Sequence, residues 1–221
     1  MSDEQNTPST PSTFYYEEGR DEMADYVPTS IKRLLDVGCA RGKFGMNLLR
    51  DNSDLEIWGV EPFEDAARVA QERLARVINT TVEDSLTCLP EGYFDCAVFN
   101  DSLEHLADPW TVLGQLRAKL APGATVVASI PNLRYFHVIK QLLQEADFEY
   151  APYGVLDKTH LRFFTKKSMQ RLFTESGYRI ERIEGIKPAA FPWKFGVMNL
   201  LSGNAFEDAR YERFALVASP S

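Results

Sequence analysis

The sequence predicts an α/β fold in which a mostly parallel sheet of seven strands carries helices on both faces. Short apolar runs alternate with segments of helical spacing between residues 31 and 130, and a Gly-rich turn follows the first run. Strands and helices that alternate at this interval form parallel sheets with both faces covered. The run at residues 94–100 (FDCAVFN) is apolar enough for burial on both faces, as expected of a central strand.

The elements follow in order from residue 31. The runs expected to form strands are residues 31–37, 55–60, 76–82, 94–100, 124–130, 178–184 and 213–219. A helix is expected to begin after the first run, near Phe44, and a second near Pro62, whose missing N–H costs little at a helix start. A third begins at Asp108-Pro109. Residues 133–148 and 168–177 also indicate helices, whereas residues 186–209 indicate irregular chain.

Domain organisation follows from where this alternation begins and where it is interrupted. Residues 1–13 (MSDEQNTPSTPST) are rich in Ser, Thr and Pro, so we expect a disordered tail there. Residues 14–221 are long enough to form one domain that buries its own core. Residues 131–164 interrupt the alternation, and we expect them to form a small lid or insertion on the substrate side, after the fifth strand.

Composition excludes several classes of partner. The net charge of -8 and the sequence pI near 5.0 argue against nucleic acid, because phosphate binding needs clustered Lys and Arg. No run approaches ~18 apolar residues, so no membrane is expected as a partner. Three cysteines without a CxxC pair indicate reduced thiols and a cytoplasmic protein. The oligomeric state is not indicated.

The Gly-rich turn occupies residues 35–45 (LDVGCARGKFG). Glycine lets a backbone approach a ligand closely, and the start of the following helix favours negative groups. The spacing differs from the G-x-G-x-x-G of dinucleotide-binding proteins, and Asp36 lies two residues before the first glycine. A carboxylate at that point suits a cationic amino group better than a pyrophosphate. The alternative is an incidental turn between a strand and a helix.

A second carboxylate, Glu61, ends the second strand about 20 residues after the turn. A carboxylate at this place can accept hydrogen bonds from the hydroxyls of a ribose. A Glu at a strand end is more often a solvated cap, so the interpretation depends on the turn that precedes it.

Together these features closely resemble the class I S-adenosylmethionine-dependent methyltransferases, which have a Rossmann-like fold, over residues 15–185. The resemblance implies S-adenosyl-L-methionine as cofactor and S-adenosyl-L-homocysteine as product. It implies that Asp36 meets the methionine amino group and that Glu61 holds the ribose. The residues whose backbone would pass beside the cofactor are Gly38, Cys39, Ala40 and Gly42. Those that would flank the adenine are Pro62 and Phe63.

The sequence departs from the family pattern at two places. Ala40 replaces a glycine that many members have, and alanine fits without strain only at a negative φ. After the third strand many members have an Asp beside the adenine amino group, where this chain has Thr81. Val82 would then offer its backbone N–H, and a one-residue slip would bring Glu83 or Asp84 to that position instead.

Two further segments carry the resemblance. Residues 90–110 (PEGYFDCAVFNDSLEHLADPW) resemble the "FD…LEHL.DP" stretch of small-molecule and sugar methyltransferases, which places Asn100 and Asp101 beside the transferable methyl group. Residues 14–20 (FYYEEGR) resemble an amino-terminal lid, in which Arg20 would pair with the methionine carboxylate and Tyr16 would cover the sulfonium. The alternative for this lid is an aromatic helix packed on the core.

Histidine 105 lies in the stretch 101–105 (DSLEH). If this stretch is helical, Asp101, Glu104 and His105 share one face at spacings of three and four. Such a face resembles the metal site of some small-RNA 2′-O-methyltransferases, which add a distant His. Many relatives carry LEHL without a metal, so we expect no metal and count Asp101 and His105 among the candidate catalytic groups.

Histidine 160 lies in residues 156–165 (LDKTHLRFFT), which resemble a stretch of methyltransferases found with glycan-assembly enzymes. This loop follows the fifth strand, where the family binds its acceptor. His160 is therefore a candidate base that removes a proton from the acceptor. The alternative is that Asp157, His160 and Arg162 fasten the loop. His137 is expected to be a packing residue.

The sequence thus predicts an enzyme that methylates a sugar, a glycan precursor or a comparable small metabolite, with oxygen as the accepting atom. The sugar preference depends on family resemblance alone, because a fold does not fix a function. The alternatives are methylation of nitrogen or carbon in another small molecule, a nicotinamide-dependent oxidoreductase, and a non-catalytic protein that retains the fold.

Overall fold

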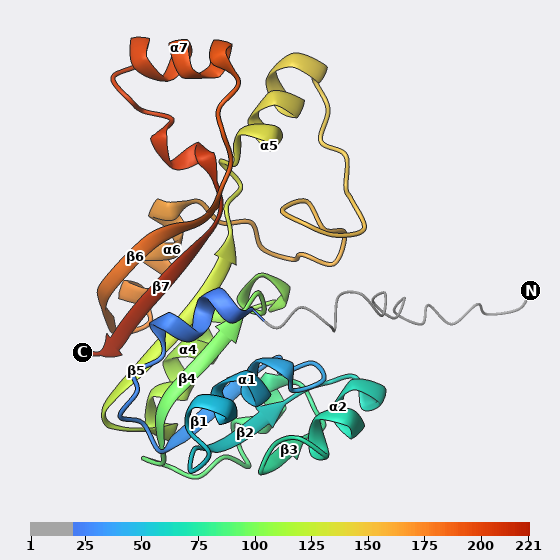
Figure 1. The fold of residues 1–221 in the computed structure, drawn as a ribbon, viewed down its shortest axis with the longest axis vertical. Coiled ribbons are helices and arrows are strands. Elements are labelled where there is room, and N and C mark those ends of the chain that lie inside the picture. The colour runs from blue at the N-terminus through green and yellow to red at the C-terminus, as the bar shows by residue number, and fades with distance from the viewer. Residues whose placement is uncertain (1–19) are drawn as a thin grey trace, which may run out of the picture.

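The computed structural model describes residues 20–221, which form a twisted sheet with helices on both faces (Figure 1). The sheet has seven strands in the order β3-β2-β1-β4-β5-β7-β6. The strands are β1 (Arg33–Val37), β2 (Glu56–Val60), β3 (Arg76–Ile78), β4 (Phe94–Asn100), β5 (Leu120–Pro131), β6 (Tyr178–Pro188) and β7 (Tyr211–Pro220). β1 to β5 pair in parallel, and β7 is antiparallel to both β5 and β6. The prediction of a mostly parallel seven-stranded sheet is confirmed, with β7 as the reversed strand.

Helices connect and flank these strands. They are η2 (Asp21–Tyr26), α1 (Lys43–Asp51), α2 (Glu64–Gln71), α3 (Val82–Ser85), η3 (Leu103–His105), α4 (Pro109–Leu116), η4 (Arg117–Lys119), α5 (Phe136–Lys140), η5 (Gln141–Glu145), α6 (Lys166–Glu175), α7 (Trp193–Leu201) and η6 (Glu207–Arg210). The start of α4 was predicted correctly: Pro109 is its first residue, and Asp108 Oδ1 accepts a 3.1 Å hydrogen bond from the Thr111 N–H.

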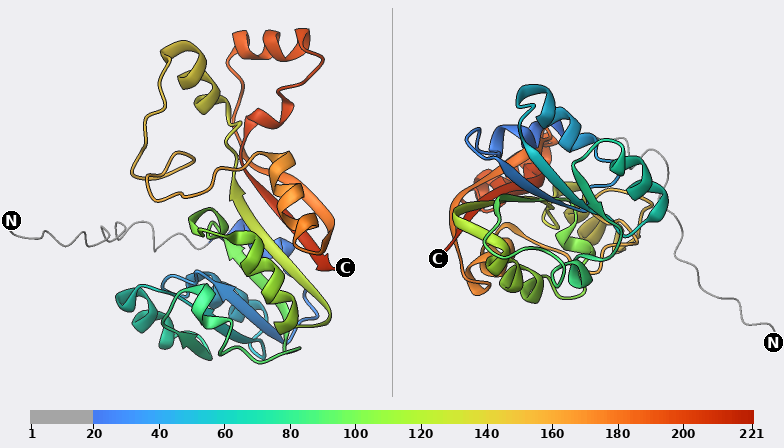
Figure 2. Two further views of the ribbon diagram at one scale, coloured as in Figure 1. Left: turned by 180° about the vertical axis from the view of Figure 1, so that it is seen from behind. Right: turned by 90° about the horizontal axis from the view of Figure 1, so that it is seen from below.

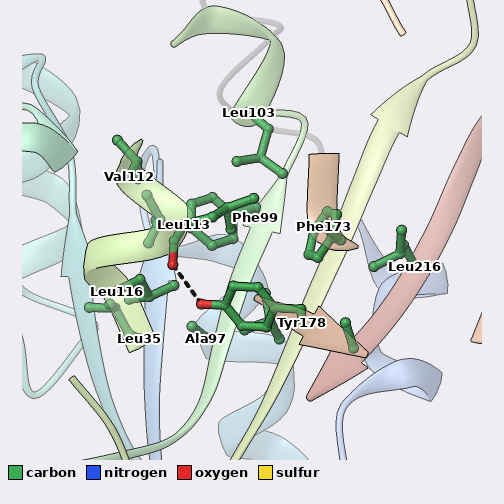
Figure 3. Close-up of a cluster of buried hydrophobic side chains, with 14 of the residues drawn as sticks. Leu35, Ala97, Phe99, Leu103, Val112, Leu113, Leu116, Phe173, Tyr178 and Leu216 are labelled. Atoms are coloured by element: carbon green, nitrogen blue, oxygen red, sulfur yellow. Dashed lines mark hydrogen bonds between the residues drawn. The ribbon is translucent and has the colours of Figure 1, made fainter. Parts of the chain in front are cut away.

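One face of the sheet packs against α3, α4 and α6. Leu35, Ala97 and Phe99 lie on this face of the central strands, in the same buried cluster as Leu113 of α4 and Phe173 of α6 (Figure 3). Apolar burial on this scale is the main stabilising contribution to such a fold. The Tyr178 hydroxyl donates a 2.8 Å hydrogen bond to the Leu113 carbonyl, so its buried oxygen keeps a partner within the core (Figure 3).

The opposite face packs against η2, α1 and α2. Its strand residues alternate with those of the first face, so Leu34, Cys96 and Val98 lie here beside Met23 and Phe44. Alternation of this kind follows from the period of two in a strand. The two faces seen in Figure 2 therefore use successive residues of the same central strands.

The order of the strands locates the place where a ligand can bind. Chain order runs outward from β1 to β2 and β3 on one side, and from β4 to β5 on the other. The connection after β1 leads to one side of the sheet, and the connection after β4 leads to the other side. Such a reversal opens a crevice at the carboxyl ends of these two strands. The residues that follow β1, β2 and β4 are the Gly-rich turn, Glu61 and Asp101.

Several expected boundaries were wrong. β3 ends at Ile78 because Thr81 caps α3, with Thr81 Oγ1 3.3 Å from the Asp84 nitrogen. The helix expected at residues 133–148 is only α5 and η5, which ends at Ala146 with a left-handed φ of 52°. Residues 186–209, expected to be irregular, contain α7 and η6. The sequence of α7 (WKFGVMNLL) is apolar on most sides, so it carries no clear 3.6-residue pattern.

Figures 1 and 2 show α5 and α7 at one end of the molecule, beyond the sheet. They touch through aromatic rings, with centroids of Phe136 and Phe195 5.8 Å apart. Within residues 20–221, none of the helices combines the length and apolarity required to cross a bilayer. Tyr16 and the expected tail at residues 1–13 lie outside the described residues.

Candidate functional site

The Gly-rich turn after β1 is a tight sequence of left-handed residues. Gly38, Ala40 and Gly42 have φ values of 79°, 49° and 73°. At Gly38 a Cβ would also lie 3.0 Å from Ser102 Cβ, a tight contact that Ser102 would have to relieve by a small shift. The positive φ is therefore the main reason for glycine at position 38, and the close neighbour adds to it. Ala40 does not have the negative φ that would relieve it, so the turn holds an alanine in a strained conformation.

Backbone hydrogen bonds hold the turn against β2. The N–H groups of Gly38 and Cys39 both donate to the Val60 carbonyl, at 2.9 and 3.1 Å. The Cys39 side chain is buried and packs on the space left by Gly59, where a Cβ would come within 2.5 Å of Sγ. Burial raises the pKa of the Cys39 thiol, so it stays protonated and only its backbone belongs to the turn.

Asp36 is a buried carboxylate in the middle of this arrangement. Its side chain is 1% exposed, and Oδ2 has no hydrogen-bond partner among residues 20–221. Burial, and then the negative charge of Glu61, raise the pKa of Asp36 to about 7. A carboxylate that is buried without a partner is costly, which indicates a place for a cationic or hydrogen-bonding ligand group.

Glu61 fastens the turn to the end of β2. Glu61 Oε2 accepts a 2.9 Å hydrogen bond from the Ala40 N–H, and Oε1 accepts one of 3.0 Å from the Phe63 N–H. Burial raises the pKa of Glu61, while these two hydrogen bonds oppose the rise. A carboxylate oxygen has two lone pairs, so each oxygen can still accept a bond from a ligand. We refer to Asp36, Gly38, Ala40, Gly42 and Glu61 as the turn cluster.

The residues expected beside an adenine lie around the turn cluster. Pro62 and Phe63 are exposed just before α2. Asn79, which the sequence analysis did not identify, donates from Nδ2 to the Glu61 and Pro62 carbonyls at 2.8 and 3.1 Å. Val82 is buried at the first position of α3, whereas the hydroxyl of Thr81 serves as its cap.

Asn100 is the last residue of β4 and Asp101 comes directly after it, but the surroundings of the two side chains differ. Neither amide atom of Asn100 has a hydrogen-bond partner within the described part of the chain, although both are buried. Asp101 accepts hydrogen bonds from Arg213 Nε at 2.9 Å, from Ser129 Oγ at 2.8 Å and from Arg20. Burial favours a raised pKa for Asp101, but Arg213 and Arg20 outweigh it, and the pKa lies below its ordinary value. Asp101 is therefore an ionised anchor between two arginines.

Arg20 and Arg213 bring opposite ends of the described chain to one carboxylate. Arg20 was expected to pair with a ligand carboxylate and instead contacts Asp101 in this structure. Arg213 was not identified from the sequence, although an arginine at the start of an apolar run is an unusual feature. Both arginine side chains are about nine-tenths buried, so their positive charges need a negative partner within the protein. Asp101 is a partner of both.

Glu104 lies next to this anchor and has no comparable partners. It is 1% exposed, and neither carboxylate oxygen has a hydrogen-bond partner among residues 20–221. Burial, and then the charge of Asp101, raise the pKa of Glu104 well above its ordinary value. The Glu104 carbonyl accepts 2.9 Å bonds from the N–H groups of Leu161 and Arg162, which ties η3 to the loop that carries His160.

His105 and His160 meet across this tie, with ring centroids 4.8 Å apart. His105 Nδ1 lies 3.2 Å from the Thr159 carbonyl oxygen, and His160 Nδ1 lies 3.1 Å from that of Val155. Burial lowers the pKa of both imidazoles, so both are neutral near pH 7. We refer to Glu104, His105 and His160 as the histidine cluster.

The 101–105 stretch is not the helical turn that was considered. Asp101 has a left-handed φ of 51°, and only Leu103–His105 forms a short 3-10 turn. Asp101 therefore turns toward its arginines, while Glu104 and His105 join His160. A cavity lies between the two groups, and its lining includes Asp101, Glu104 and His160.

Asp157 and Arg162 make hydrogen bonds that hold the 156–165 loop, and Asp157 also lines the cavity. Asp157 accepts hydrogen bonds from the N–H and hydroxyl of Thr159, at 2.8 and 2.7 Å. Arg162 donates from Nε to the Ala107 carbonyl at 3.0 Å. His137 lies outside the cavity lining, in ring contact with Phe136 at 4.0 Å.

The sequence of the chain is similar to that of proteins named as methyltransferases. Residues 14–183 match the model of a family described as "Methyltransferase domain". An uncharacterized methyltransferase of Schizosaccharomyces pombe is 29% identical over 138 residues, which cover 58% of this chain and 46% of that protein. The chain thus spans about half the length of that relative. A ubiquinone biosynthesis O-methyltransferase of Aeromonas salmonicida is 25% identical over 74% of this chain and 70% of its own length.

Among solved structures, an S-adenosylmethionine-dependent methyltransferase from Archaeoglobus fulgidus superposes with a TM-score of 0.63. The superposition covers 89% of this chain and 90% of that chain, at 20% sequence identity. At this identity the likeness is one of fold.

Proposed function

Because the chain belongs to the methyltransferase-domain family, we propose that it transfers the methyl group of S-adenosylmethionine to an oxygen atom of a small-molecule acceptor. The observation that carries the choice of oxygen is that Asp101, Glu104 and His160 line a small cavity beside the end of β4, whose volume of about 20 Å³ has room for about one water molecule or one acceptor hydroxyl. A hydroxyl acceptor must lose its proton, and this cavity contains titratable groups that face it.

The turn cluster fits the cofactor. Asp36 has one buried oxygen without a partner, and the amide of Asn100 has two such atoms, all at the carboxyl ends of neighbouring strands within residues 20–221. Asp36 would accept a bond from the methionine amino group, and Glu61 would accept bonds from the ribose hydroxyls. The backbone of Gly38, Cys39, Ala40 and Gly42 would pass beside the cofactor.

Once bound, S-adenosylmethionine supplies an electrophilic methyl group on a sulfonium, so the protein needs no nucleophile of its own. The acceptor oxygen forms a bond to the methyl carbon while the carbon–sulfur bond breaks, and the electron pair of that bond stays on sulfur. The chain must therefore position the acceptor, exclude water and remove one proton. We assign removal of the proton to the members of the histidine cluster that line the cavity, which are Glu104 and His160.

The acceptor class is a sugar, a glycan precursor or a comparable hydroxyl-bearing metabolite. Residues 131–164 would cover its binding site, because four residues of this segment line the cavity: Pro131, Gly154, Asp157 and His160. The resemblance of residues 156–165 to glycan-associated methyltransferases supports this class. The name of the Aeromonas relative, an O-methyltransferase, supports oxygen as the accepting atom.

Methylation of nitrogen is the second candidate. Glu104 lines the cavity as a buried carboxylate whose oxygens have no hydrogen-bond partner within residues 20–221, and a cationic amine would suit it, although Arg20 and Arg213 also line the cavity. The two candidates differ in their need for a base. An amine loses its proton more readily than a hydroxyl, so nitrogen transfer should survive loss of His160.

The test is a screen of nucleotide sugars, glycans, phenols and amines with S-adenosylmethionine that carries a radiolabelled methyl group. With the best acceptor, His160→Ala should lower turnover at least tenfold while the affinity for S-adenosylhomocysteine changes less than twofold. His137→Ala, a substitution outside the cavity, is the matched control. Turnover that survives in His160→Ala would favour nitrogen transfer. Cofactor binding without methylation of any acceptor would support a non-catalytic binding protein.

A further inference from the structure

We infer that Glu104, His105 and His160 form a binding site for one divalent transition-metal cation. One ligand atom from each of the three residues lies within 4.8 Å of the other two. Within residues 20–221 this is the one group of three His, Cys, Asp or Glu side chains that lie so close together. The inference departs from the sequence-based expectation that the protein holds no metal.

The first argument comes from Glu104. Its two carboxylate oxygens are buried without a hydrogen-bond partner in the described part of the chain. The charges of Arg213 and Arg20 act on Glu104 and oppose the rise in its pKa, but both form ion pairs with Asp101, and neither oxygen of Glu104 accepts a hydrogen bond from them. A buried carboxylate with no partner is rare in folded proteins, since its desolvation is not compensated. A bound cation would compensate it.

The second argument comes from the orientation of the imidazoles. In both histidines Nδ1 faces a backbone carbonyl oxygen, of Thr159 for His105 and of Val155 for His160. The tautomer that donates from Nδ1 carries its lone pair on Nε2. Histidines that bind metals are held in this way, with the other ring nitrogen donating to a carbonyl or carboxylate. His160 Nε2 lies on the side of Glu104, 3.9 Å from its Oε1.

The third argument comes from spacing. Two ligand atoms bonded at about 2.0–2.2 Å to one tetrahedral ion lie roughly 3.4 Å apart. His160 Nε2 and Glu104 Oε1 are 3.9 Å apart, and the three ligand atoms all lie within 4.8 Å of one another, so the side chains would move inward when an ion binds. Two imidazoles with one carboxylate suit Zn²⁺, Co²⁺, Fe²⁺ or Mn²⁺ better than Mg²⁺ or Ca²⁺. Three protein ligands leave at least one coordination position for another molecule.

The metal would take part in the proposed methyl transfer, so this role of the site rests on the proposed function. Asp101 lines the same cavity as Glu104 and His160, so a molecule bound to the metal would lie near the end of β4. Coordination to a divalent cation would lower the pKa of an acceptor hydroxyl and so reduce its need for a base. His160 would then act as a metal ligand in place of the base role assigned to it in the proposed function. This role explains why a neutral, buried imidazole next to a carboxylate is useful there.

The experiment measures metal binding without any acceptor. The full chain is treated with a chelator, exchanged into metal-free buffer and titrated with Co²⁺ and Zn²⁺ in separate calorimetric runs. We expect one equivalent of Zn²⁺ and one of Co²⁺ to bind. We also expect the Co²⁺ form to show visible d–d absorption of the intensity typical of four- or five-coordinate cobalt. Absence of saturable binding near one equivalent would overturn the inference.

Variants identify the ligands. Glu104→Gln keeps the volume of the side chain but removes the charge, and His160→Ala removes a ring. Each should weaken Co²⁺ binding at least tenfold and reduce the visible absorption. His137→Ala should bind as the wild type does. Equal affinity in Glu104→Gln and wild type would overturn the assignment. Binding of S-adenosylhomocysteine to each variant within twofold of wild type serves as the control for folding.

The outcome for the metal and the outcome for the proposed function are separable. Metal binding that responds to Glu104→Gln, in a protein that methylates no acceptor, would leave the metal site standing and reject the proposed function. Oxygen methylation that is unaffected by the chelator, together with no metal bound, would confirm methyl transfer and reject the metal site.

Discussion

The turn cluster and the histidine cluster lie at the same edge of the sheet, but they are assembled differently. The turn cluster comes from the ends of two neighbouring strands, and its Glu61 accepts hydrogen bonds from the N–H groups of Ala40 in the turn and of Phe63. The histidine cluster joins η3 to a loop far along the chain, through backbone bonds to the Glu104 carbonyl. Its neighbour Asp101 depends on arginines from both ends of the described chain. The first cluster is local in sequence, whereas the second exists only once the whole domain has folded.

From this comparison we expect the largest loss of stability when the buried ion pair between Asp101 and Arg213, beside the histidine cluster, is broken. Arg213→Met should lower the free energy of unfolding by about 3–5 kcal/mol, because it removes one partner from the buried Asp101 carboxylate. Urea unfolding at neutral pH measures the effect.

The control for this variant is Arg182→Met, which breaks an exposed pair with Glu184 and should cost much less. The double variant Asp101→Asn with Arg213→Met should recover part of the loss, since the buried carboxylate that has lost one of its two arginines is then neutral. Equal costs for the two arginine variants would mean that the buried anchor contributes no more than a surface ion pair.

The next largest effect is expected in the turn cluster. Glu61→Ala should weaken binding of S-adenosylhomocysteine by about 1.5–3 kcal/mol, because Glu61 would accept bonds from the ribose hydroxyls. It should also destabilise the protein itself, since the Ala40 and Phe63 N–H groups lose their acceptor. Calorimetry and urea unfolding separate the two effects. Glu64→Ala, three residues later and exposed, should leave cofactor affinity unchanged. Unchanged affinity in Glu61→Ala would remove Glu61 from the ribose site.

The turn cluster should also make cofactor affinity depend on pH. In the free protein the pKa of Asp36 is about 7, and the cationic amino group of the ligand binds its ionised form. The affinity for S-adenosylhomocysteine is therefore highest above pH 7, and it falls as the pH drops through 7 because Asp36 becomes protonated. Between pH 8 and pH 6 the affinity for S-adenosylhomocysteine should fall about tenfold, which is roughly 1.4 kcal/mol. Calorimetry at the two pH values measures it. Asp36→Asn should bind weakly and with little dependence on pH, and an equal slope in this variant would exclude Asp36 as the titrating group.

The same contrast explains how much the sequence could predict. The strands, the turn and Glu61 follow from local patterns, since a strand period, a glycine and a strand-end carboxylate lie within about 30 residues. Asn79 was missed because a single asparagine in a loop carries no pattern, although it donates to two carbonyls of the site. Arg213 was missed because its partner, Asp101, lies more than 100 residues earlier and meets it only through the antiparallel pairing of β5 and β7. The sequence put Glu104 and His105 on one face of a possible helix and His160 on the loop expected at the acceptor, but only the fold shows that their ligand atoms converge.

The smallest effect concerns the conformation of the turn. Ala40 has a φ of 49°, where an L residue with a Cβ is disfavoured by about 1–2 kcal/mol. Ala40→Gly removes this strain but adds freedom to the unfolded chain, which offsets about 0.5–1 kcal/mol of the gain. The free energy of unfolding should therefore rise by about 0.5–1 kcal/mol, measured by urea unfolding of the ligand-free protein. Ala118→Gly, at an exposed position with negative φ, should instead destabilise the protein by a similar amount. If both glycine variants are destabilised alike, Ala40 is not strained, and the turn in solution differs from the one described.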